Sequence, residues 1–314
     1  FFPKAEKGAA LGMNAGLGNL GVSAVQFLVP VVITFALFGA LGGEAQTWTK
    51  GDQTKQVWLQ NAGFVWVPFI ILSSLAAWFG MNDIASAKAS FADQAMIFKR
   101  KHNWLMCWLY TGTFGSFLGF AAGFPLLIKS QFDGVDPTQY AFLGPLVGAL
   151  ARPIGGRLSD KLGGARVTQL VFIGMIIGVV GVLTFLPQNG KGGNFWGFFA
   201  CFLALFALTG IGNGSTFMQI PAIFGSLHMR NAQGKGEAAI EAARLSANRE
   251  SAAVLGFTAA IAAYGGFLIP KSYGTSMDLT GGVEGALYAF IIFYISCVLI
   301  NWWYYARKGA EAPC

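Results

Sequence analysis

One arginine lies deep within an apolar stretch of this sequence. Arg152 occurs in GPLVGALARPIGG, eight residues before Asp160. If the stretch is a helix, a rise of about 1.5 Å per residue places Arg152 roughly 12 Å from the polar segment that contains Asp160. A guanidinium keeps its proton and holds five donors in a fixed plane, which suits a small planar oxyanion. Arg152 is therefore the first candidate binding residue, and a side chain that snorkels to the membrane surface is the alternative interpretation.

The sequence offers Arg152 no acidic partner at a similar depth. All fourteen Asp and Glu residues fall in predicted loops or at the ends of predicted spans, so an anionic substrate is the natural counter-ion. His102 and His228 also lie at span ends, whereas proton-driven transporters commonly relay protons through intramembrane carboxylates or histidines. This pattern disfavours proton symport by this part of the protein. The same pattern supplies none of the intramembrane carboxylates or histidines that acid–base or metal catalysis would use. We therefore expect no enzyme, no metal site and no cofactor.

The composition is that of a membrane protein. Of 314 residues, 54% are hydrophobic and 11% are charged, and the mean hydropathy is +0.55, whereas soluble domains carry about 25% charged residues. Windows of about 20 apolar residues can cross a bilayer. The sequence contains eight, at residues 12–38, 62–79, 104–128, 140–158, 167–186, 195–220, 252–269 and 286–305. The predicted fold is therefore an all-α membrane protein with about eight transmembrane helices.

The basic residues predict the orientation of these spans. With the first residue in the cytoplasm, fifteen of the 21 Lys and Arg residues fall in cytoplasmic segments and five on the opposite side, as the positive-inside rule requires. Both ends are then cytoplasmic, in a multi-pass protein of the cytoplasmic (inner) membrane. The net charge of +7 reflects this orientation, and no nucleic-acid partner is expected because basic and aromatic residues do not interleave on a polar face.

The first predicted span is unusually rich in glycine. Its sequence GMNAGLGNLGVSAVQ includes Gly12, Gly16, Gly18 and Gly21. In a bilayer, helices associate through small residues, so these positions would admit a neighbouring backbone or a small solute. Asn19 is expected to face the bundle interior, because an amide that faces lipid lacks partners. A helix-packing face without substrate contact explains the glycines equally well.

The most specific short motif is GGRLSDKLGGAR at residues 155–166. It resembles the signature loop of the major facilitator superfamily, in which an acid and a base make charge contacts that hold the inward gate. The resemblance assigns a gating role to four residues, and a solvated basic loop is the alternative. The four are Gly156, Asp160, Lys161 and Arg166.

Further segments narrow the resemblance to one family. AGLGNLGVSAVQFLVP resembles the first nitrate signature of the nitrate/nitrite porter family, and GFTAAIAAYGG resembles the second, although Ala stands where the family often has Gly or Ser. The segments FFPKAEKGAALGMNAG, GMNDIASAKAS, TGTFGSFLGFAAGF and GIGNGSTFMQIPAIF are also similar to that family. The match covers essentially the whole chain and implies an N-terminally truncated bundle that corresponds to spans five to twelve of twelve. Residues 1–80 would then hold the last two spans of the N-terminal half, residues 81–103 the cytoplasmic connector, and residues 104–314 the C-terminal six-helix half.

The resemblance also implies a substrate site. The family binds nitrate between two arginines, one from each half, and Arg152 matches the C-terminal one. Tyr110 and Phe114 match aromatic residues that flank the anion, and their spacing of four puts them on one helical face, although core packing also explains Phe114. Asn19 matches the amide of the first signature, and Gly256 belongs to the second. The residues implied for the pathway or for helix packing are Gly16, Gly18, Gly21, Asn213 and Gly266.

The function implied is secondary transport of nitrate and nitrite across the cytoplasmic membrane by alternating access. A monomer in the lipid bilayer that exchanges nitrate for nitrite is the leading hypothesis, and a proton-coupled symporter of nitrate or another small anion is the alternative. A passive anion channel belongs to a different class. The Asp160–Lys161 motif argues against it, as does a weak repeat between FLVP at residues 27–30 and FLIP at residues 267–270.

Overall fold

The computed structural model describes residues 7–50, 53–82, 94–187 and 192–314. Within these residues, the chain divides into two compact units. One comprises the start of the first helix and everything after residue 88, and the other comprises residues 23–88. The first helix, α1 (Lys7–Val32), continues from the one unit into the other.

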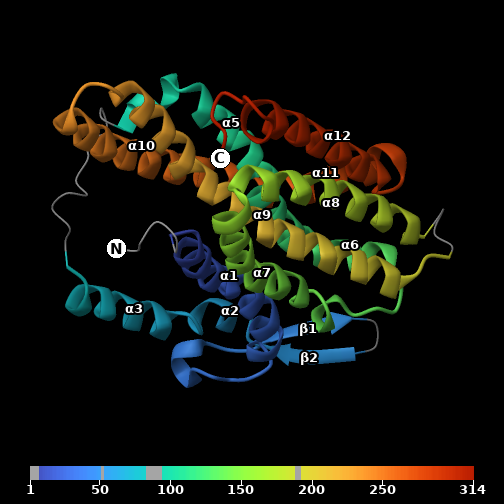
Figure 1. Cartoon of the computed structure of the whole chain (residues 1–314). Coiled ribbons are helices and arrows are strands. Elements are labelled where there is room, and N and C mark those ends of the chain that lie inside the picture. The colour runs from blue at the N-terminus through green and yellow to red at the C-terminus, as the bar shows by residue number, and fades with distance from the viewer. Residues whose placement is uncertain (1–6, 51–52, 83–93, 188–191) are drawn as a thin grey trace. The chain divides into compact units, whose positions relative to one another are not determined.

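The larger unit is a bundle of long helices (Figure 1). In chain order after α1 they are α5 (Lys101–Tyr110), α6 (Ser116–Gln131), α7 (Leu143–Leu162), α8 (Gly164–Phe185), α9 (Phe195–Ala232), α10 (Glu237–Ala263), α11 (Gly265–Thr280) and α12 (Glu284–Asn301). Short 3₁₀ turns η3 (Met96–Lys99) and η5 (Pro137–Gln139) precede α5 and α7. The π-helical turns η4 (Thr111–Gly115) and η6 (Trp302–Ala306) join α5 to α6 and follow α12.

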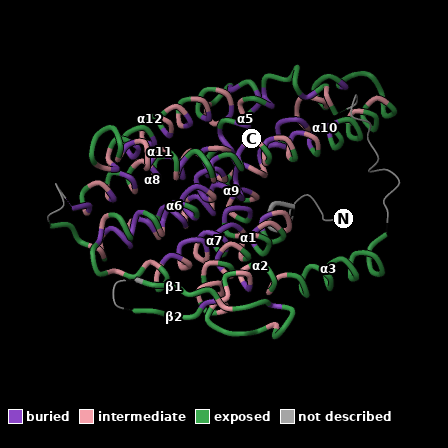
Figure 2. Tube along the Cα trace, turned by 180° about the vertical axis from the view of Figure 1, so that it is seen from behind, coloured by how far each residue is buried: buried purple, intermediate pink, exposed green. Residues whose placement is uncertain are grey.

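The smaller unit contains the end of α1, the 3₁₀ turn η1 (Gly39–Gly42), a β-hairpin, α2 (Asn61–Phe64) and α3 (Val67–Gly80). Strands β1 (Gln46–Lys50) and β2 (Gln53–Val57) pair antiparallel, with Gln46 opposite Val57. The all-α prediction did not include this hairpin, which fills part of the connection between the first two predicted spans. No residue of α3 is buried, and its residues are exposed along its whole length (Figure 2).

Each of the eight predicted spans overlaps a helix. Among the described residues, seven helical stretches are long and apolar enough to cross a membrane. The helix of the fourth predicted span, α7, is not one of these seven. It has 20 residues and includes four charged ones, which lower its hydropathy. The polar segment before the seventh predicted span is also helical, since it forms the first part of α10. Helices α10 and α11 together make a stretch of 44 residues, Glu237–Thr280. Residues 83–93 of the predicted connector at 81–103 lie outside the described residues, and its last part forms η3 and the start of α5.

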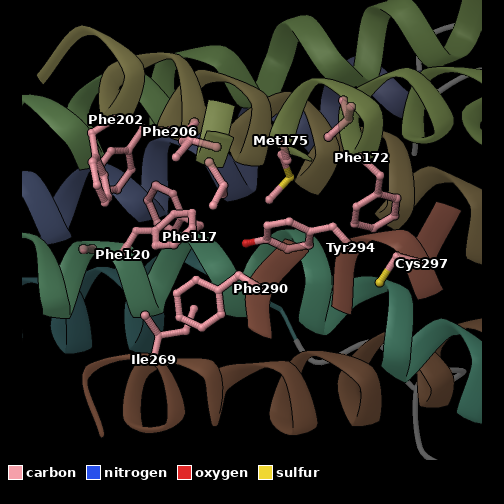
Figure 3. Close-up of a cluster of buried hydrophobic side chains, with 14 of the residues drawn as sticks. Phe117, Phe120, Phe172, Met175, Phe202, Phe206, Ile269, Phe290, Tyr294 and Cys297 are labelled. Carbon is pink, nitrogen blue, oxygen red and sulfur yellow. The ribbon is translucent and has the colours of Figure 1, made fainter. Parts of the chain in front are cut away.

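The core of the larger unit is built from aromatic side chains. Phe117 and Phe120 of α6 meet Phe206 of α9 at ring-centroid distances of 6.2 Å, and Phe120 also meets Phe290 of α12 at 6.2 Å (Figure 3). These rings prefer the edge-to-face geometry seen here. Because helices gain little from burying apolar faces against lipid tails, interlocking shape holds this bundle together.

Glycines bring α7 and α9 into backbone contact. A Cβ at Gly210 of α9 would overlap the carbonyl of Gly148 on α7, and a Cβ at Gly155 would overlap the carbonyl of Ile211. A Cβ at Gly214 would lie 2.5 Å from the carbonyl oxygen of Arg152. Only residues without a side chain permit this approach. The seam therefore sets the position of the backbone that carries Arg152.

The backbone contact between α7 and α9, called the seam here, predicts that one added methyl group lowers the stability of the protein. Gly210→Ala forces the α7 and α9 backbones apart, and we expect a loss of about 1–3 kcal/mol, typical of overpacking. The matched control is Gly225→Ala on the same helix, where a Cβ meets no atom within 4 Å, so its stability should be unchanged or slightly higher. Thermal unfolding of the purified protein in detergent measures both. Equal midpoints for the two variants would contradict this account of the seam.

Candidate functional site

Arg152 is buried between three aromatic rings. Its Nη2 donates a hydrogen bond to the Tyr110 hydroxyl at 2.9 Å, and the two residues are 3% and 1% exposed. The guanidinium carbon lies 5.6 Å from the ring centroid of Phe114 and 5.5 Å from that of Phe217. The Tyr110 ring stacks on Phe114 at 5.2 Å and lies 5.7 Å from Phe217. The structure thus brings Arg152, Tyr110 and Phe114 together, as the family resemblance implied.

A π-helical turn shapes the aromatic side of the site. The predicted third span is continuous, but Thr111–Gly115 forms π-helix between α5 and α6. A Cβ at Gly112 would lie 2.6 Å from the Phe172 ring, and one at Gly115 would lie 2.9 Å from the Ala262 carbonyl. Turns of this kind are frequent at functional sites. Here the turn follows Tyr110 directly and contains Phe114.

Within the described chain, the charge of Arg152 has no acidic partner. Among the described residues, no carboxylate forms an ion pair with it, and its Nε is buried without a hydrogen-bond acceptor. An uncompensated buried charge is costly. Cation–π attraction to the faces of Phe114 and Phe217 offsets part of that cost. A small anion with two or three acceptor oxygens would match the remaining donors.

Asn213 and Phe217 bring α9 into the site. Asn213 is fully buried, and neither its Oδ1 nor its Nδ2 has a partner within the described chain. It lies one helical turn before Phe217, between Gly212, which packs against Thr113 of the π-turn, and Gly214, which packs against the Arg152 backbone. Phe217 was missed from the sequence. The available signal was its position directly after the small-residue segment GNGST, four residues after Asn213.

The predicted glycines of α1 fall into two groups. Gly12 and Gly16 are buried against α7: a Cβ at Gly12 would lie 3.1 Å from the Arg152 carbonyl, and one at Gly16 would lie 2.9 Å from the Ala149 carbonyl. A Cβ at Gly18 or Gly21 would meet no described atom within 4 Å. The first pair therefore packs α1 beside the Arg152 backbone, whereas the second pair lies on an open face.

The other predicted pathway residues lie away from these contacts. The Nδ2 of Asn19 is buried with no hydrogen-bond partner in the described part of the chain. Gly256 is exposed on α10, where a Cβ would meet no described atom within 4 Å, and the nearest atom to a Cβ at Gly266 is Leu118 Cβ at 3.7 Å. Among the described contacts, neither a hydrogen bond nor a ring contact joins any of these three residues to Arg152.

The predicted gating loop is a tight helical corner. α7 runs to Leu162 and α8 begins at Gly164, so Gly163, with φ +89°, is the whole connection. Asp160 and Lys161 lie on the last turn of α7, and Arg166 lies on the first turn of α8. Gly156 is buried one turn earlier, where its backbone nitrogen packs against Gly214. The motif is therefore helical where the sequence indicated a loop.

A second charged cluster joins the N-cap of α5, the last part of α9 and the middle of α10. The Glu250 carboxylate accepts hydrogen bonds from Arg100 Nε at 2.6 Å and Nη2 at 3.2 Å, and it lies 2.6 Å from His228 Nε2. The Glu250 side chain is 1% exposed. The structure places this residue within α10. Its two partners are 150 and 22 residues away, so no local pattern indicates the cluster.

Comparison with known proteins gives the family. No family model matches the chain. The nitrate/nitrite transporters NarU of Salmonella typhimurium and Escherichia coli are each 48% identical to it over 98% of the chain and 66% of their own length. The probable nitrate/nitrite antiporter NarK2 of Thermus thermophilus is 45% identical over the whole chain and 67% of its own length. This chain belongs to the nitrate/nitrite porter family of the major facilitator superfamily.

The porter chain spans just under two thirds of the length of the two NarU relatives. A solved structure agrees with the fold. The crystal structure of the major facilitator transporter FucP in the outward conformation superposes with a TM-score of 0.57 at 12% identity, covering 96% of this chain and 69% of FucP. The membrane-spanning helical bundle predicted from the sequence is thus confirmed as that of a major-facilitator-type transporter.

The buried carboxylate of this porter predicts a large stability effect. Glu250→Gln leaves Arg100 and His228 without their anion, and we expect a loss of about 2–3 kcal/mol, less than for a fully buried pair because Arg100 is half-exposed. The control is Glu241→Gln, which removes an exposed pair with Arg244 at 3.7 Å and should cost at most about 0.5 kcal/mol. Thermal unfolding in detergent distinguishes them, and a silent Glu250→Gln would contradict a structural role for the cluster.

Proposed function

We propose that this protein moves nitrate and nitrite across the cytoplasmic membrane by alternating access, in exchange for one another. The observation that carries the proposal is the guanidinium of Arg152, buried between Phe114 and Phe217 with its Nε unpaired within the described chain. The relatives named as nitrate/nitrite transporters, and one named as a probable antiporter, support the same substrates. The protein acts as a transporter and catalyses no reaction.

Planar oxyanions fit the donors of this site. A guanidinium presents two parallel N–H groups to one edge of a planar anion. The Tyr110 hydroxyl accepts a hydrogen bond from Arg152 at 2.9 Å, so its own proton is available for the anion. The rings of Phe114 and Phe217 exclude water from the same space, which strengthens both hydrogen bonds. A strongly hydrated anion would lose more on entry than nitrate or nitrite does.

The electrostatics of the site favour exchange over symport. Proton coupling requires a group near the substrate that gains and loses a proton, and no described carboxylate or histidine contacts Arg152. The buried carboxylate of Glu250 is already shared by Arg100 and His228. The family resemblance pairs Arg152 with a second arginine from the other half. Two facing arginines repel each other, so the halves close only when an anion lies between them.

The remaining predicted residues take supporting roles in this proposal. Asn19 and Asn213 offer amides along the pathway, Gly256 lines it, and Gly12 and Gly16 keep α1 close to α7. The helical corner with Asp160, Lys161 and Arg166 forms part of the inward gate. Residues 1–80, 81–103 and 104–314 are the end of the N-terminal half, the cytoplasmic connector and the C-terminal half. The protein is a monomer with both ends of this chain in the cytoplasm.

Counterflow in proteoliposomes tests the exchange. For the full-length protein, we expect internal nitrite to accelerate uptake of labelled external nitrate without any dependence on a proton gradient. Arg152→Lys keeps the charge but loses the planar pair of donors, so uptake should fall by about 100-fold, the effect of losing a charged hydrogen-bonded contact. Arg157→Lys, five residues along the same helix and exposed, should transport normally. Uptake that needs a proton gradient and ignores internal nitrite would instead establish a symporter.

The Tyr110 hydroxyl makes a smaller, separate contribution. Tyr110→Phe keeps the ring and removes one donor, and we expect nitrate affinity to fall by about tenfold, as for the loss of one hydrogen bond to a charged group. Because the bond also orients Arg152, the nitrite affinity should fall in parallel. Tyr288→Phe, which alters a side chain 57% exposed, is the control. Equilibrium binding to protein in detergent measures both, and an unchanged affinity in Tyr110→Phe would remove the hydroxyl from the site.

A further inference from the structure

A basic cavity lies at the corner where α7 meets α8, far along the chain from the residues that contact Arg152. It has a volume of about 340 Å³ and is lined by the end of α7, the start of α8 and the segment that follows η6. Three of its lining residues are basic: Arg166, Arg307 and Lys308. None of its described lining residues is acidic. A cavity with this lining attracts an anion.

The cations of the cavity have donors to offer. Arg307 Nε donates to the Trp303 carbonyl at 2.9 Å, and its guanidinium stacks 4.1 Å from the Trp303 ring. This contact fixes the plane of the guanidinium and leaves its terminal nitrogens for a ligand. Arg166 and Lys308 are exposed, and no ion pair to any of the three is found in the described part of the chain.

The acidic residue nearest in sequence is occupied elsewhere. Glu311 accepts a hydrogen bond from Lys101 at 2.6 Å and lies 3.3 Å from His102 Nε2. The hydrogen bond from Lys101 lowers the pKa of Glu311, so this carboxylate is ionised at neutral pH and already paired. It does not line the cavity. The Glu311 side chain therefore does not neutralise the positive charge of the cavity.

An apolar surface continues from the cavity along two packed helices. Gln169 of α8 donates to the Val298 carbonyl of α12 at 3.3 Å, which joins the helices side by side. Exposed apolar side chains follow both: Leu170, Ile173 and Ile177 on α8, and Ile295, Leu299, Trp302 and Trp303 on α12 and the η6 turn after it. Tryptophans at the end of such a surface are typical of the membrane–water interface. The cavity thus has the position of a lipid headgroup above its acyl chains.

We propose that this cavity binds the phosphate of an anionic phospholipid, with Arg166, Arg307 and Lys308 as its cationic contacts and the α8–α12 surface as the bed for its acyl chains. Basic pockets between membrane helices on the cytoplasmic side bind phosphate headgroups in this manner. A soluble phosphate shares the headgroup chemistry but gains nothing from the apolar surface, so the lipid binds more tightly. The bound lipid ties the segment after η6 to the first turn of α8, beside the Asp160–Lys161 corner.

Native mass spectrometry of the full-length protein tests the site. The protein in detergent is titrated with phosphatidylglycerol and, separately, with phosphatidylcholine, and the bound lipids are counted. We expect the wild type to retain phosphatidylglycerol about tenfold better, and Arg307→Gln/Lys308→Gln to lose that preference, as expected for two basic contacts. The control Lys235→Gln/Arg244→Gln removes the same charge from exposed positions outside the cavity and should keep the preference.

A further variant guards against a folding defect. Lys308→Glu changes one exposed side chain, leaves the Arg307–Trp303 contact intact, and should also lower the retention of phosphatidylglycerol by about tenfold. If the control double variant lost the preference for phosphatidylglycerol, general surface charge would hold the lipid. If every variant kept that preference, the cavity would not be the binding site. Displacement of the lipid by millimolar glycerol 3-phosphate would make the occupant a soluble phosphate, and would overturn the lipid assignment.

Discussion

The buried, unpaired charge of Arg152 is the constraint on which the rest of the structure depends. A guanidinium inside a membrane bundle is tolerated only if its surroundings supply hydrogen-bond acceptors or polarisable faces. Here Tyr110 supplies one acceptor, and the rings of Phe114 and Phe217 supply two faces. None of these neutralises the charge. A carboxylate in their place would pair with Arg152 permanently, and a transported anion could not compete with it. The absence of an acid from the described surroundings is thus what keeps the site useful.

The glycines position this charge. Gly210 and Gly214 of α9 bring the backbone of α7 into contact, so the carbonyl of Arg152 lies directly against Gly214. Gly112 and Gly115 do the same for the π-turn, which packs against Phe172 and the Ala262 carbonyl. Each close contact leaves little freedom for the helices to slide. The small residues of this bundle therefore fix the positions of its helices, a role that large apolar side chains take in the cores of soluble proteins.

Hydropathy predicted the helices, and the depth of Arg152 within an apolar stretch marked it as a candidate, because these signals lie within single segments of chain. Tyr110 and Phe114 became candidates only through the family resemblance. The π-turn was not predictable, since it depends on the packing of Gly112 and Gly115 against other helices. Phe217 is one of 29 phenylalanines, and only its proximity to Arg152 distinguishes it. The Glu250 cluster joins residues 150 positions apart, so no local sequence pattern indicated it. What escaped prediction was in each of these cases a contact between distant segments.

The two buried charges of this bundle illustrate two electrostatic strategies. Glu250 is buried with both of its oxygens bound by Arg100 and His228, and such a fully paired charge holds α5, α9 and α10 in one arrangement. Arg152 is buried with donors to spare, and its free energy therefore depends on what occupies the space beside it. A charge of the first kind favours a single conformation. A charge of the second kind links conformation to ligand, because closing the site around an empty guanidinium is costly and closing it around an anion is not. Under the proposed function, the unpaired charge is accordingly the part of the porter that senses its substrate.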